Sequence, residues 1–162
     1  MGTSEQKGLN MKKFTKSVLG VTLLEIMLVL AIAAMIIVMS VRYYQSATAN
    51  QQANAALQMI QGITAAADSL AQASGSYQSA VTDTSIQSLM PNNSMLLPWG
   101  TTITVSGQSP TTYQVSLAST PAAVCVLLKS RLGSSAKYLS AGVTANTCTT
   151  VSTFSYTYDT TQ

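Results

Sequence analysis

The chain has 162 residues, of which 47% are hydrophobic and only 8% are charged, a length that allows one globular domain and one additional long helix. Its formal net charge of +3 is carried by the first 20 residues, and the charged side chains after residue 20 sum to zero. We therefore expect no basic surface for nucleic acid. The chain has no histidine and five carboxylate side chains, so we expect no metal site, no cofactor and no enzymatic activity.

An apolar run occupies residues 21–41 and ends before Arg42. As a helix, these 21 residues would be about 31 Å long, enough to cross the hydrocarbon core of a bilayer. Lys12, Lys13 and Lys16 precede the run, and basic residues of this kind stay on the cytoplasmic side. The pattern predicts a membrane helix with its N-terminus facing the cytoplasm.

Glu25 is the one acidic residue in this apolar run. A carboxylate inside a membrane costs on the order of 3 kcal/mol unless it is paired or lies near an interface. If the chain is cut after Gly20, the new amine of Val21 carries a positive charge four residues from Glu25, in the same subunit or in a neighbour. In a low-dielectric setting the two charges would pair strongly.

The basic leader, Gly20, Glu25 and the apolar stretch that follows together resemble the class III signal of type IV pilins and related pseudopilins. The resemblance implies that a prepilin peptidase cuts between Gly20 and Val21 and methylates the amine of Val21. It also implies that Glu25 recognises the N-terminus of an adjacent subunit during assembly. Two features indicate the type IVb branch. A first mature residue of Val is typical of it, and so is a leader of 20 residues. If translation starts at Met11, the leader has only ten residues and no longer favours type IVb.

Two simpler interpretations of the apolar run remain open. One is a plain single-pass anchor. The other is a secretory signal cut after the small residues 47–49. The second fits poorly, because residues 26–41 exceed the usual apolar core of about 7–15 residues and Glu25 interrupts the approach to it.

The helical pattern continues beyond the apolar run. Apolar or small residues recur at steps of three and four, while glutamines and Asp68 occupy the other faces, which is typical of an amphipathic helix. The recurring positions are Ala53, Leu57, Ile60, Thr64, Ala67 and Leu70 or Ala71. We expect one helix over 21–73, about 80 Å long, ended by Gly75. The predicted organisation is a cleaved leader (1–20), a hydrophobic transmembrane and assembly helix (21–52) and a globular head (53–162).

Shorter elements follow in the head. We expect a loop as far as Gly100, interrupted by one short helix that begins at Thr84 or Ser85 and ends at Met90 before Pro91, and closed by a turn at 98–100. Alternating apolar residues predict antiparallel strands over 102–106 and 112–118, and a last strand over 151–158 that lies between or beside them. Between the second and the last of these strands we expect a helix that has Thr120 as its N-cap and Pro121 at its first position and that ends at Gly133.

The sequence contains two cysteines, Cys125 and Cys148. An even pair in an exported domain predicts a disulfide, and 22 intervening residues would make it worth roughly 3 kcal/mol in the chain-entropy model. Two free buried thiols are the alternative. No C-x-x-C spacing occurs, so a redox-active pair is not expected.

The resemblance extends into the head, where residues 42–47, 97–100 and 121–137 look like those of type IVb pilins, notably the bundle-forming type. The chain is shorter than that type and is similar in size to the conjugative thin-pilus pilins. It implies an α+β pilin fold, in which a long N-terminal helix packs on a C-terminal antiparallel-type sheet with a short additional helix. It also implies that the disulfide bounds a variable region displayed on the filament.

The expected function is therefore that of a type IVb pilus subunit, which polymerises into a surface filament for adhesion, aggregation or conjugative mating. The expected partners are copies of itself, the prepilin peptidase, the inner membrane and the pilus assembly machinery, with a receptor on a host or recipient cell. We expect the chain in the bacterial inner membrane before assembly and in an extracellular pilus afterwards. The alternatives are a pseudopilin of a type II secretion system and an enzyme or ligand-binding domain on a membrane anchor.

Overall fold

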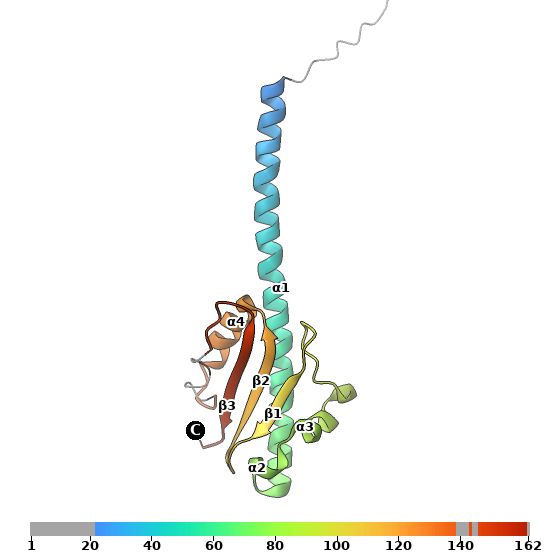
Figure 1. The fold of residues 1–162 in the computed structure, drawn as a ribbon, viewed down its shortest axis with the longest axis vertical. Coiled ribbons are helices and arrows are strands. Elements are labelled where there is room, and N and C mark those ends of the chain that lie inside the picture. Colours follow the sequence, from blue (N-terminus) through green and yellow to red (C-terminus); the bar gives the residue numbers. More distant parts are fainter. Residues whose placement is uncertain (1–21, 139–142, 144–145, 162) are drawn as a thin grey trace, which may run out of the picture. The chain divides into compact units, whose positions relative to one another are not determined.

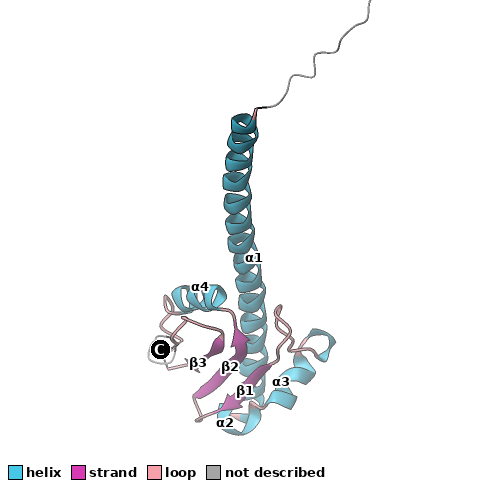
Figure 2. Ribbon diagram, turned by 45° about the horizontal axis from the view of Figure 1, so that its top comes forward, coloured by secondary structure: helices cyan, strands magenta, loops and turns pink. Residues whose placement is uncertain are grey.

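The computed structural model describes residues 22–138, 143 and 146–161, so the predicted cleavage site at Gly20 and Val21 lies outside the described residues. The fold is α+β, as predicted (Figures 1 and 2). Its elements, in chain order, are α1 (Leu23–Ser74), α2 (Tyr77–Ala80), α3 (Asp83–Leu89), the 3-10 helix η1 (Pro91–Asn93), β1 (Ile103–Gly107), β2 (Thr112–Thr120), α4 (Ala122–Leu132) and β3 (Ser152–Asp159).

The chain divides into two compact units, one ending at Ser40 and the other beginning at Val41. Helix α1 contributes residues to both. No residue of 22–40 is buried, whereas the second unit, which we call the globular unit (41–162), contains every buried residue of the described chain. The hydrophobic core of the protein is therefore built after residue 40.

The predicted amphipathic helix is confirmed in the second half of α1. Its buried face has a three- and four-residue spacing and consists of Ala49, Ala53, Ala56, Ile60, Ile63, Ala66 and Ala67. Ala53, Ile60 and Ala67 are buried as predicted, whereas the other predicted positions, Leu57, Thr64, Leu70 and Ala71, are only half-buried at the edge of this face. The helix ends as expected at Gly75, which has a φ of 78°, a left-handed conformation that costs glycine little. The Gly75 N–H donates to the Ala71 carbonyl at 2.7 Å, which satisfies one of the last helical acceptors.

The three strands form one antiparallel sheet in the order β1-β2-β3, beside the second half of α1 (Figures 1 and 2). The register pairs Val105 with Val115 and Val115 with Tyr156. The last strand therefore lies beside β2 and not between earlier strands. On each strand alternate side chains are buried, which places Ile103, Val105, Tyr113, Val115, Leu117, Phe154, Tyr156 and Tyr158 in the core.

Two short elements, α2 and η1, form where the sequence predicted loop. Four residues are too few to show helical periodicity. Helix α2 is held by tertiary hydrogen bonds at its two ends: the Tyr77 N–H donates to the Pro110 carbonyl at 3.1 Å, and the Val81 carbonyl accepts from the Gly107 N–H at 2.9 Å. A Cβ on Gly107 would lie 2.7 Å from the Cα of Gln78, so only glycine lets β1 approach α2 this closely.

The predicted start of α4 needs a correction. Thr120 is not its N-cap: Thr120 ends β2, and its hydroxyl donates to the Leu117 carbonyl at 3.0 Å. Pro121 takes the cap position and makes no side-chain cap hydrogen bond. After a shift of register between Leu117 and Thr120, Thr120 still pairs with Ser152 of β3, so it belongs to the strand and not to the helix. Gly133 ends the helix as expected.

Candidate functional site

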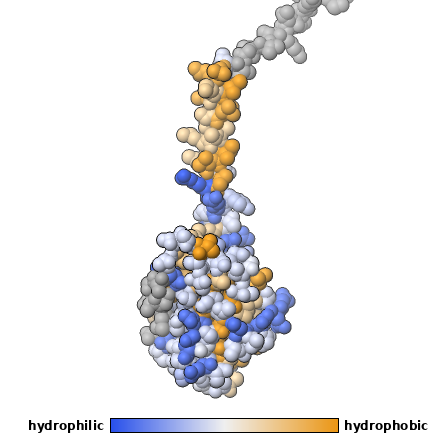
Figure 3. Space-filling view, viewed as in Figure 1, coloured by the Kyte–Doolittle hydropathy of each residue, from blue (hydrophilic) through white to orange (hydrophobic). Residues whose placement is uncertain are grey.

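The first part of α1 carries a long row of exposed apolar side chains. Its large apolar side chains range in exposure from 46% at Ile26 to 78% at Leu23, and Figure 3 shows them as an almost unbroken apolar surface on the face in view. This part of α1 is long enough and apolar enough to cross a membrane, judged by length and composition. The exposed large hydrophobic residues are Leu23, Leu24, Ile26, Met27, Leu28, Val29, Leu30, Ile32, Met35, Ile36, Ile37, Val38, Met39 and Val41.

Glu25 lies in the first turn of α1, and the structure adds a local reason for its position. Thr22 precedes the helix, and its hydroxyl oxygen accepts a hydrogen bond from the Glu25 N–H at 3.3 Å, which is the geometry of an N-cap. A carboxylate at this position interacts favourably with the positive end of the helix dipole. Thr22 and Glu25 have the T-x-x-E spacing of a capping box, and this spacing would have predicted the N-cap from the sequence.

The Glu25 carboxylate itself makes no hydrogen bond or ion pair with any residue that the structure describes. It is therefore available to a group from outside the described chain. Its pairing with the amine of Val21 stays a prediction, because Val21 lies outside the described residues.

The predicted disulfide is present and joins Cys125 on α4 to Cys148, with a Cα–Cα distance of 5.4 Å. Cys125 is fully buried, while Cys148 is partly exposed. The bridge ties the segment before β3 to α4, and the described residues include no free thiol.

Asn146, which the sequence analysis missed, fastens the same segment to the edge of β3. Its side-chain amide donates to the Ser155 carbonyl at 2.8 Å and its side-chain oxygen accepts from the Ser155 N–H at 3.0 Å. These two bonds satisfy backbone groups that an edge strand would otherwise leave unpaired. The Asn146 carbonyl also accepts from Lys129 Nζ at 2.9 Å. Disulfide and amide together hold the C-terminal region of the globular unit in place.

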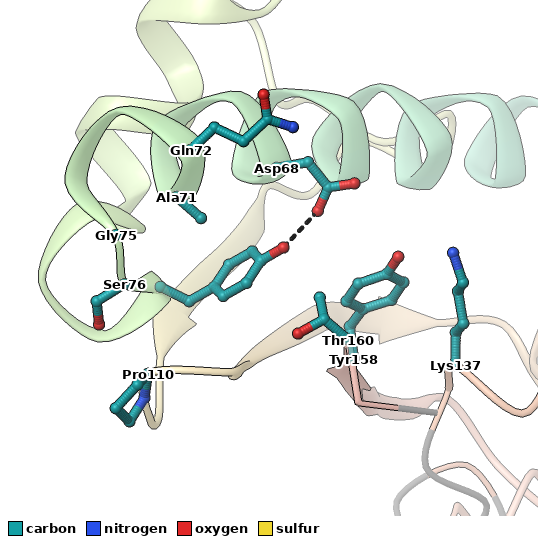
Figure 4. Close-up of a pocket in the computed structure, with 10 residues that line it drawn as sticks. Asp68, Ala71, Gln72, Gly75, Ser76, Pro110, Lys137, Tyr158 and Thr160 are labelled. Carbon is teal, nitrogen blue, oxygen red and sulfur yellow. Dashed lines mark hydrogen bonds between the residues drawn. The ribbon is translucent and has the colours of Figure 1, made fainter.

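A pocket of about 330 Å³ opens near the C-terminal end of α1 (Figure 4). On one wall the Tyr77 hydroxyl donates to Asp68 Oδ1 at 2.7 Å, and Tyr158 and Lys137 stand on the other wall (Figure 4). Burial, followed by the bond to Asp68, raises the pKa of Tyr77, so this hydroxyl remains a protonated donor. The pocket thus contains a carboxylate, an ammonium group and a tyrosine hydroxyl that is bonded to that carboxylate.

A second hollow of about 460 Å³ lies between α1 and α4. Ala49 and Ala123 are small and let the hollow form, while Val126 on its rim is 55% exposed. Its wall is mainly apolar, and no charged residue other than Arg42 lines it. This hollow is a second uncovered apolar surface, this time on the globular unit.

Among the described residues, no group of three or more histidine, cysteine, aspartate or glutamate side chains is arranged to hold a metal ion. No protein-family model matches the chain, and comparisons with characterised proteins and with solved structures give no significant match. The long apolar N-terminal helix, the small antiparallel sheet and the disulfide are compatible with a pilin-like fold but are not specific to it.

Proposed function

We propose that the protein is the structural subunit of a type IVb pilus and polymerises through the apolar half of α1. The observation that carries the proposal is the uncovered apolar surface over Leu23 to Val41, in which fourteen large hydrophobic side chains are exposed. A soluble monomer rarely exposes an apolar patch of this extent. Outside a bilayer, equivalent helices of other copies are the surface that could bury it.

The magnitudes favour assembly. For a helix outside the bilayer, burying one Leu, Ile, Val or Met side chain contributes about 1.5–3 kcal/mol relative to water, so even partial burial of fourteen such residues outweighs the roughly 3 kcal/mol cost of one buried carboxylate. The apolar residues therefore supply the affinity. Glu25 supplies selectivity, because a copy that packs in the wrong register leaves its carboxylate buried without a partner.

The geometry of the proposed contact leads to a fibre. A contact in which one copy presents its Glu25 and the next copy presents its Val21 amine is heterologous, and heterologous contacts that do not close into a ring continue indefinitely. Cleavage between Gly20 and Val21 by a prepilin peptidase would create the amine that the contact needs.

The cellular setting belongs to the same proposal. The chain would reside in the inner membrane until assembly and then in an extracellular filament. Its globular unit, which has few charged residues and many serines and threonines, would form the outer surface and could serve adhesion, aggregation or mating.

The first experiment is intact-mass and N-terminal peptide mass spectrometry on fibres sheared from the surface of the native host. We expect a chain that begins at methylated Val21 and contains oxidised Cys125 and Cys148. A chain that begins near Asn50, or one that retains Met1 and is absent from the fibres, would contradict the proposal.

A substitution at Glu25 tests assembly, and a substitution at Gly20 tests processing. Glu25→Gln should be cleaved normally but yield no filament, since the amide keeps the side-chain shape and loses the charge. Asp159→Asn, on the globular unit, is the matched control and should assemble like the wild type. Gly20→Leu should leave the precursor uncut. Wild-type filament levels from Glu25→Gln would refute the pairing role.

A further inference from the structure

We propose that Arg42, Tyr43 and Tyr44 form an interfacial anchor that fixes the depth of α1 in a lipid bilayer, at the membrane surface opposite the basic N-terminus. The partner is the headgroup region of a phospholipid bilayer. The inference rests on the membrane-resident stage of the proposed function, and it does not depend on filament formation.

The spacing of charges along α1 sets the first constraint. Arg42 follows Glu25 by 17 residues, with no charged residue between them, which corresponds to about 26 Å of helical rise. The hydrocarbon core of a bilayer is about 30 Å thick. Both charged groups can reach the headgroups only if the helix stays close to the membrane normal, because tilting shortens the distance that it spans.

The second constraint comes from the two tyrosines. Tyr43 and Tyr44 are 79% and 72% exposed, although each has an apolar ring that could be buried. Consecutive helical residues point about 100° apart, so the pair covers a wide arc of the helix surface. Tyrosines are enriched at the headgroup level, where the ring contacts acyl chains and the hydroxyl stays hydrated.

Arg42 limits how far α1 can move along the membrane normal. Its aliphatic stem can lie along apolar surface while the guanidinium remains in the headgroup region, so one residue closes the apolar segment at a defined depth. An arginine on the non-cytoplasmic side opposes the usual bias of basic residues towards the cytoplasm, but four lysines precede the segment and favour the orientation with the N-terminus inside.

The distribution of apolar side chains around the helix favours lipid, and not another protein, as the partner of residues 23–41 before assembly. Residues 23–41 have exposed large hydrophobic side chains at every helical angle and no buried face. A helix that is apolar on all sides matches a membrane span, whereas a helix that packs on one soluble partner has a polar face. Apart from Glu25 and Ser40, the polar side chains of the helix begin at Arg42, where the proposed anchor starts.

The test measures the depth of single tryptophans in the full, unassembled chain in phosphatidylcholine–phosphatidylglycerol vesicles. Trp99 is the only tryptophan, so the background is Trp99→Phe with the disulfide verified by mass. Tyr43→Trp and Tyr44→Trp report on the anchor, Met35→Trp on the middle of the segment, and Ser88→Trp on exposed surface of the globular unit. Lipids brominated near the glycerol end or near the chain terminus act as shallow and deep quenchers.

We expect Tyr43→Trp and Tyr44→Trp to lose more fluorescence with the shallow quencher, Met35→Trp to lose more with the deep one, and Ser88→Trp to be quenched by neither. Adding Arg42→Leu to Tyr44→Trp should shift its quenching towards the deep lipid, whereas Arg42→Lys should not. The inference is overturned if positions 43 and 44 behave like position 35 or like position 88. Because assembly is not involved, this result is separate from failure of the filament proposal.

Discussion

The hydroxyl of Tyr77 donates to Asp68 Oδ1 at 2.7 Å, which connects α2 to α1 across the turn at Gly75. Tyr77 is almost fully buried, and its ring stacks on that of Tyr113 at a centroid distance of 5.4 Å. The bond therefore satisfies a hydroxyl that burial would otherwise leave without water, and it fixes the end of α1 against the sheet.

Removing this hydroxyl should destabilise the globular unit. Tyr77→Phe loses a bond to a partly buried carboxylate, and we expect the free energy of unfolding to fall by about 1–2 kcal/mol. Thermal unfolding of the full chain in detergent micelles measures the change. In a double-mutant cycle with Asp68→Ala, the two effects should not add. Strict additivity would show that the bond contributes nothing.

Tyr156 offers the opposite case. It is fully buried, and its hydroxyl has no hydrogen-bond partner among the described residues. Tyr156→Phe removes an unsatisfied polar group and keeps the ring contact with Tyr138. We expect an increase in the free energy of unfolding of about 1 kcal/mol at neutral pH. A less stable Tyr156→Phe would mean that the hydroxyl has a partner after all.

The same burial predicts sensitivity to alkali. Burial raises the pKa of Tyr156 and of Tyr113 above the ordinary tyrosine value. Above about pH 10 the unfolded chain loses these protons and the folded chain keeps them, so stability is complete below that pH and is lost as the pH rises. The expected slope is about 1.4 kcal/mol per pH unit for each tyrosine. Unfolding followed from about pH 8 to about pH 11 should show it, and Tyr156→Phe should reduce the slope.

Gly107 should not tolerate a side chain. Gly107→Ala places a Cβ against the backbone of α2, and overpacking of this kind costs about 1–3 kcal/mol. Gly62→Ala is the matched control, because its Cβ would meet only the flexible end of Met90, at 3.4 Å, and alanine is the better helix former. We expect the melting temperature to fall for the first variant and to hold or rise for the second. Equal effects would contradict the close approach of α2 and β1.

Loss of the disulfide should weaken the globular unit. Cys125→Ser removes a bond that closes a loop of 22 intervening residues, for which the chain-entropy model gives roughly 3 kcal/mol. We expect lower stability and lower abundance of the protein. The double variant Cys125→Ser with Cys148→Ser controls for a stray thiol and should melt with the single variant. Unchanged melting under oxidising conditions would show that the bridge carries no stability.

Local patterns in the sequence were sufficient for the regular elements. The three- and four-residue spacing predicted the amphipathic part of α1 and its buried Ala53, Ile60 and Ala67. The alternation of Phe154, Tyr156 and Tyr158 predicted the buried face of β3. Both predictions work because a helix and a strand each impose a fixed period on their side chains. The cysteine pairing also followed, since Cys125 and Cys148 are the only two cysteines.

The tertiary structure decided what depends on residues distant in sequence. Helix α2 forms because Pro110 and Gly107 bond to its two ends, and Asn146 acts as a strand partner only because Ser155 lies beside it. Thr120 carries the residue type of a helix cap but ends a strand, because it still pairs with Ser152 of β3 after a shift of register. A periodic pattern depends on neighbours along the chain and is determined by the sequence alone. Hydrogen-bond partners across the fold exist only once the sheet has packed against α1.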